Sequence, residues 1–104
     1  MKIEWSEQSR SDLHEILSYV GMNFGRHKAE EVLLDIRECA ELLKEFPSLG
    51  KVFMKDPELG ITYRSLTAKL YKMVYSVDNE TITIVTVWQN RQDIGRLKKL
   101  IKEK

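Results

Sequence analysis

Apolar residues in the first half of the chain recur with the period of an amphipathic helix. The first stripe follows the i, i+3, i+4, i+7 pattern and comprises Leu13, Ile16, Leu17 and Val20. Ser6 is suited to cap this helix, because its hydroxyl can accept from a first-turn N–H. A second stripe covers 27–46 and ends at Pro47. Gly21 and Gly25 provide a turn between them, so the pattern predicts a helical hairpin.

Beyond residue 51 the spacing of apolar residues changes to a period of two, which is typical of strands. The stretches with strand character there are 52–54, 61–66, 70–77 and 81–88, and a further one opens the chain at 2–5. Asp93 is suited to cap a final helix whose inward face is Ile94, Leu97, Leu100 and Ile101. We predict the order β-α-α-β-β-β-α and an α+β class, with a helical hairpin packed on a small antiparallel sheet and a C-terminal helix. Residues 1–104 form a single domain.

The net charge of +1 conceals an asymmetry between the two halves of the chain. Residues 1–50 carry 6 basic and 10 acidic side chains, whereas residues 51–104 carry 11 and 6. A basic half is a hint of a polyanionic or acidic partner and makes residues 51–104 the expected working face. The charged start of the chain does not resemble a signal peptide, and no apolar run approaches the ~20 residues of a membrane span. We therefore expect an intracellular protein without membrane contact.

The sequence argues against metal and cofactor chemistry. His14 and His27 are 13 residues apart, and Cys39 is the one cysteine, so neither a zinc site nor a disulfide framework can be assembled from them. The glycines do not cluster in a phosphate-binding loop. We expect no cofactor and no metal.

Cations on the predicted strands are the more informative candidates. If the hairpin covers one sheet face, the other face could present Arg64, Lys72 and Arg91 with Tyr63 or Tyr71 nearby, a combination suited to single-stranded nucleic acid. For Lys72, a solvent-facing position on an open sheet face is an equally good interpretation. RNA cleavage would also need a base, and no histidine follows residue 27. That base would have to be Lys72 or a tyrosine with a depressed pKa.

Several short stretches, in this order and spacing, resemble the RelE/ParE superfamily of bacterial toxins from type II toxin–antitoxin modules. They are Trp5-Ser6, Ala29, residues 42–51, residues 63–66 (Tyr-Arg-Ser-Leu), residues 71–75 (Tyr-Lys-Met-Val-Tyr) and residues 87–94. The resemblance covers nearly the whole chain. It implies a cytoplasmic growth inhibitor that forms a heteromeric complex with a cognate antitoxin, whose disordered segment wraps the toxin.

The superfamily has two branches with different targets. RelE-like members cut messenger RNA in the ribosome, and ParE-like members inhibit DNA gyrase. Lys72 stands where RelE-like enzymes have an arginine, and nothing aromatic follows Trp88, whereas residues 47–51, 64–66 and 91–94 are more similar to ParE. The resemblance therefore favours a gyrase inhibitor. The alternatives are a metal-independent nuclease, with Arg64, Lys72, Arg91 and Tyr71 as its catalytic residues, or an inactive relative that only binds antitoxin.

Overall fold

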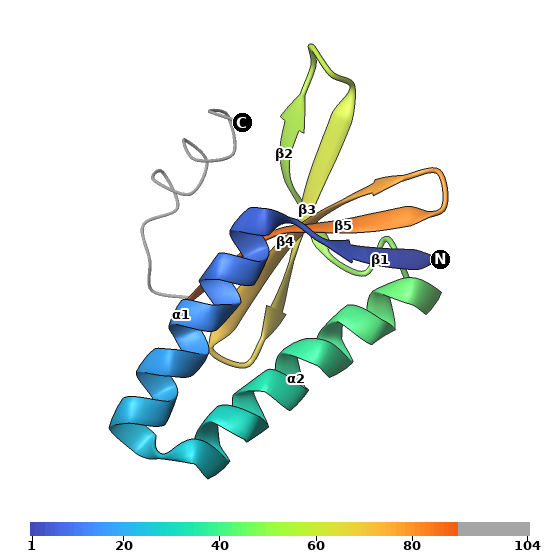
Figure 1. Cartoon of the computed structure of the whole chain (residues 1–104). Coiled ribbons are helices and arrows are strands. Elements are labelled where there is room, and N and C mark those ends of the chain that lie inside the picture. The colour runs from blue at the N-terminus through green and yellow to red at the C-terminus, as the bar shows by residue number, and fades with distance from the viewer. Residues whose placement is uncertain (90–104) are drawn as a thin grey trace.

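The computed structural model describes residues 1–89, and these form two helices and five strands (Figure 1). The elements are β1 (Lys2–Trp5), α1 (Glu7–Phe24), α2 (Arg26–Glu45), β2 (Lys51–Asp56), β3 (Ile61–Ala68), β4 (Tyr71–Asp78) and β5 (Thr81–Gln89). The α+β class is confirmed. Four strands follow the helical hairpin, at the four stretches with strand character beyond residue 51. The predicted order β-α-α-β-β-β-α has only three strands at this place and is therefore one strand short. The helix predicted from Asp93 onward lies outside the described residues.

The sheet is mixed, with the strand order β1-β5-β4-β3-β2. Strands β2 to β5 pair antiparallel with their chain neighbours, as predicted. Strand β1 instead pairs parallel with β5, from Lys2 opposite Thr81 to Trp5 opposite Ile84. The helices and three further strands separate β1 from β5 in the sequence, which provides the long connection that parallel neighbours need.

Both helices lie on one face of the sheet (Figure 1) and bury the main core there. Ile36 and Leu43 of α2 are fully buried, together with Tyr75, Ile82 and Ile84 of the central strands. Helix α1 begins as predicted, because the Ser6 hydroxyl accepts from the Ser9 N–H at 3.0 Å. It continues through Gly21 to Phe24, and Gly25 alone makes the turn into α2 with φ at 94°.

A smaller apolar cluster occupies the opposite face of the sheet. Its buried members are Val74, Val85 and Trp88. Phe53, Met54 and Tyr63 are partly buried and pack against them. Strands β4 and β5 therefore bury side chains on both faces of the sheet.

Candidate functional site on the sheet

The strand register distributes the predicted site residues over both faces of the sheet. Arg64 lies opposite Tyr75, and residues opposite each other in an antiparallel pair share a face. Tyr71 and Tyr75 belong to the core beneath the helices, so Arg64 and Tyr71 are on the helical face. Lys72 lies opposite Thr67 and Trp88, on the other face.

Of the predicted constellation, Arg64 and Lys72 therefore do not share one open face. Arg64 and Lys72 are separated by the thickness of the sheet. Arg64 and Tyr71 share a face, but the strand register offsets them by four residues, or about 13 Å along the strand. Arg91 lies outside the described residues.

The guanidinium of Arg64 is engaged in holding the turn that follows α2. Its Nη1 donates to the Gly50 carbonyl at 2.8 Å. The Tyr75 hydroxyl accepts from the Gly50 N–H at 2.9 Å and donates to the Pro47 carbonyl at 2.7 Å. These three bonds tie residues 47–50 to the sheet, and we name this arrangement the Tyr75 lock.

Only glycine fits at the centre of the Tyr75 lock. A Cβ on Gly50 would lie 2.7 Å from the Ser65 carbonyl oxygen and 2.8 Å from the Tyr75 hydroxyl. Pro47 predicted the end of the second helix, but no local sequence signal connects residues 47–50 with Tyr75. Since they are 25 residues apart in the chain, only the sheet register brings them together.

Burial raises the pKa of each tyrosine on β3 and β4 above its ordinary value. For Tyr63 a smaller contribution comes from the nearby Asp56 carboxylate, and for Tyr71 from Tyr19. For Tyr75 burial also dominates and Cys39 adds to it, while the Gly50 hydrogen bond and the Arg64 charge lower the pKa. All three phenols are protonated at neutral pH, which is the opposite of what a tyrosine general base requires.

Lys72 lies on the other face of the sheet beside an aromatic ring. It is partly buried between Thr67 and the buried Trp88. Tyr63, Ser76 and Thr83 form a cross-strand row on the same face, four residues or about 13 Å farther along β4. Lys72 can therefore contact a carboxylate or a phosphate as a point charge, without the bidentate geometry that arginine provides.

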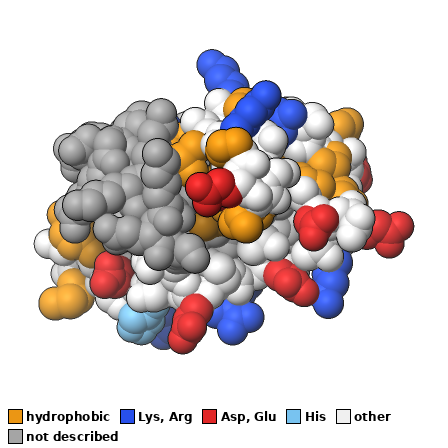
Figure 2. All heavy atoms as spheres, turned by 90° about the horizontal axis from the view of Figure 1, so that it is seen from above, with side chains coloured by type: hydrophobic (Ala, Val, Ile, Leu, Met, Phe, Trp, Pro, Cys, Tyr) orange, Lys and Arg blue, Asp and Glu red, His pale blue; other side chains and the backbone are white. Residues whose placement is uncertain are grey.

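The basic character of the second half of the chain is concentrated outside the described sheet. Residues 51–89 carry five basic and four acidic side chains, a net charge of +1, whereas residues 90–104 carry six and two, a net charge of +4. Accordingly, charges of both signs are interspersed on the face seen in Figure 2. Most of the excess of basic residues in 51–104 therefore belongs to residues 90–104.

No helix within residues 1–89 is long and apolar enough to cross a membrane. Within the same residues, no three side chains among histidine, cysteine, aspartate and glutamate gather at a position that could hold a metal ion.

A helical hairpin on one face of a five-stranded mixed sheet is a fold that this chain shares with a solved structure of a ParDE toxin–antitoxin system. The solved structure "Chromosomal ParDE TA system from P. aeruginosa" matches this chain with a TM-score of 0.71 and 21% sequence identity, over 86% of this chain and 95% of that one. The family model described as "ParE toxin of type II toxin-antitoxin system, parDE" matches residues 3–94. The chain belongs to the ParE toxin family. No curated protein matches it.

Membership of this family decides between the branches considered from the sequence. The ParE-like prediction is confirmed, and the RelE-like alternative is not favoured. A family defined by a toxin–antitoxin system also supports an antitoxin as the partner of this chain.

Proposed function

We propose that this ParE-family toxin inhibits growth by binding DNA gyrase in the cytoplasm, without cleaving RNA, until its cognate antitoxin sequesters it. The family match over residues 3–94 supports the toxin role. The choice of a binding mechanism is supported by one structural observation, which is the separation of Arg64 from Lys72.

Cleavage of RNA by its own 2′-hydroxyl needs a base, an acid and cations that converge on one phosphate. In residues 1–89 the two predicted cations lie on opposite faces, and Arg64 is bonded to the Gly50 carbonyl. The tyrosines that could replace a histidine base are held protonated by burial. This geometry favours a protein that acts by occupying a surface of its target.

The test is a supercoiling assay with purified gyrase and purified toxin, run beside primer extension on translated messages. We expect the toxin to abolish supercoiling, premixed antitoxin to restore it, and messages to stay intact. Normal supercoiling at saturating toxin would contradict the proposal. New message ends that vanish in Lys72→Ala would instead establish the nuclease, and full viability of cells expressing the toxin alone would indicate an inactive relative.

A further inference from the structure

The turn between β2 and β3 lies at the end of an arm that extends past the neighbouring strand β4. The pairing of β3 with β4 begins at Tyr63, so Ile61 and Thr62 pair, among the described residues, with β2 alone. We name residues 55–62 the β2–β3 arm. Figure 1 shows this end of β2 and β3 projecting beyond the other strands. The arm is therefore free to enter a recess of another molecule.

The turn at the end of the β2–β3 arm is held in one conformation by its own residues. The Asp56 carboxylate accepts from the Glu58 N–H at 3.0 Å and from the Leu59 N–H at 3.2 Å. Pro57 restricts the backbone between them, and Gly60 adopts the left-handed φ of 66° that returns the chain to β3. A turn that is ordered before it binds loses less conformational entropy in a complex.

This ordered turn presents one apolar side chain and two carboxylates. Leu59 is 68% exposed, and Glu58 beside it is also exposed. Residues 56–60 contain two acidic side chains and no basic one, a net charge of −2. An open depression of about 350 Å³ lies beside the turn and is lined by residues 54–58. The turn therefore combines an apolar anchor with a negative rim.

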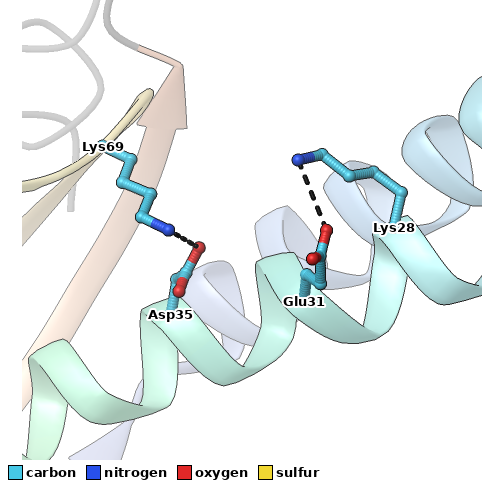
Figure 3. A network of polar contacts seen from close by, with 4 residues as sticks. All are labelled: Lys28, Glu31, Asp35 and Lys69. Atoms are coloured by element: carbon cyan, nitrogen blue, oxygen red, sulfur yellow. Dashed lines mark ion pairs between the residues drawn. The ribbon is translucent and has the colours of Figure 1, made fainter.

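Acidic residues on α2 have a different environment, because cations of the chain itself neutralise them (Figure 3). Lys69, in the turn between β3 and β4, is 3.1 Å from Asp35, and Lys28 is 3.5 Å from Glu31. Residues 56–60 include no cation that could play this part. The charge of the turn is consequently suited to a basic surface of a partner.

We propose that the β2–β3 arm docks on the DNA-binding surface of gyrase, with Leu59 in an apolar recess and Asp56 and Glu58 against cations that otherwise hold DNA phosphates. This inference rests on the proposed function, because it names the surface of that target. An enzyme that binds duplex DNA presents lysine and arginine to the phosphates, so its charge complements that of the turn.

Two other occupants fit the β2–β3 arm less well. In a dimer of this chain through the arm, the carboxylates of the two turns would repel each other. A disordered antitoxin segment folds as it binds and can adapt to many surfaces, so it does not need an ordered, projecting turn. A folded partner with a recess does need one, because it changes shape little on binding.

The test measures the dissociation constant of the full-length toxin for purified gyrase. Leu59→Ala removes the apolar anchor. D56N/E58Q removes the charge and keeps an oxygen at position 56 that can accept both hydrogen bonds of the turn. Circular dichroism and thermal midpoints verify that each variant is folded.

The two other turns of the sheet supply matched controls. Leu70→Ala lies in the turn between β3 and β4, where Leu70 is 71% exposed. D78N/E80Q neutralises an aspartate and a glutamate with the same spacing at the turn between β4 and β5, where both are exposed. These controls separate a role of the arm from a general effect of exposed leucines or of net charge.

We expect Leu59→Ala and D56N/E58Q each to raise the dissociation constant at least fivefold, while both controls stay within twofold of the wild type. Added salt should weaken binding of the wild type more than binding of D56N/E58Q. Gyrase that is saturated with a linear DNA duplex should bind the wild type at least fivefold more weakly. Values within twofold for both variants, or equal affinity with and without DNA, would overturn the inference.

The same measurements distinguish failure of this inference from failure of the proposed function. If the wild type does not bind gyrase, both are wrong. If it binds and inhibits gyrase and the two arm variants do so equally well, gyrase remains the target and the arm is not its contact. A wild-type dimer that Leu59→Ala dissociates, or a loss of antitoxin affinity with unchanged gyrase affinity, would also overturn the inference by assigning the arm another partner.

Discussion

At the scale of single residues, Tyr75 combines a core role with a polar one. Its ring is fully buried beneath the helices, yet its hydroxyl bonds to both ends of the turn at residues 47–50. Such an arrangement is stabilising because a buried N–H without a partner is costly. The Arg64 guanidinium adds a third hydrogen bond, to the Gly50 carbonyl. A cation that the sequence suggested for phosphate binding therefore holds this turn against the sheet.

Tyr75→Phe should lower the free energy of unfolding by about 1–3 kcal/mol, since it leaves the buried Gly50 N–H and the Pro47 carbonyl without this partner. Urea denaturation measures the change. Tyr19→Phe is the matched control, because the Tyr19 side chain is half-exposed at the surface of α1, and it should change stability little. Equal stability of the two variants would show that the Tyr75 lock contributes nothing.

Two glycines should respond in opposite directions to replacement by alanine. Gly50→Ala pushes a methyl group against the Ser65 carbonyl and should cost about 1–3 kcal/mol. Gly21→Ala lies inside α1 at an ordinary 3.9 Å from Ala29 and should stabilise by up to about 1 kcal/mol, because alanine is the better helix former. Thermal midpoints distinguish them, and a tolerated alanine at position 50 would contradict the close approach described for the lock.

Stability should decline in alkali because of the buried tyrosines. Burial raises the pKa of Tyr63, Tyr71 and Tyr75 above 10.0 in the folded state. The unfolded chain then releases protons first, so the stabilisation is complete below about pH 10 and is lost as pH rises through the folded pKa values. Urea midpoints from pH 8 to 11 test this, and a flat profile would count against the burial of these phenols.

At the scale of elements, the edge of β5 is hydrogen-bonded first by β1 and then by a side chain of α1. Strand β1 pairs with β5 as far as Ile84, and the Ser6 N–H donates to the Ile84 carbonyl at 3.0 Å. Beyond that point the Asp12 carboxylate accepts from the Val87 N–H at 3.1 Å and from the Thr86 hydroxyl. The Asp12 side chain thus accepts hydrogen bonds that a neighbouring strand would otherwise accept, next to the bulge between β4 and β5.

Asp12→Ala should therefore destabilise the protein by about 2–3 kcal/mol, because hydrogen bonds to a charged group are stronger than average and their loss leaves an N–H of β5 unpaired. Glu15→Ala, on the exposed side of the same helix, is the control and should change stability by less than about 0.5 kcal/mol. Hydrogen exchange of the Val87 amide reports the effect locally. Unchanged protection there in Asp12→Ala would refute it.

The sequence predicted the elements better than their arrangement. Hydrophobic period, the Ser6 cap and Pro47 determine where each helix begins or ends, because these are local properties. The parallel pairing of β1 with β5 depends on contacts about 80 residues apart and has no local signal. Likewise, Arg64 and Lys72 differ in face because of strand register, which a shift of one residue would reverse.

At the scale of the whole molecule, the described sheet carries little of the excess of basic residues found in the second half of the chain. Residues 51–89 carry a net charge of +1, and residues 90–104 carry a net charge of +4. Family membership shows a toxin of a toxin–antitoxin system, and its two described candidate cations, Arg64 and Lys72, lie on opposite faces of the sheet.

The most direct measurement titrates the toxin against purified gyrase at several gyrase concentrations. A toxin that acts by binding should give a half-inhibitory concentration that rises in proportion to gyrase, once gyrase exceeds the dissociation constant, with inhibition that antitoxin reverses. A small fixed amount of toxin that inactivates ever more gyrase with time, or unimpaired supercoiling at saturating toxin, would contradict the account.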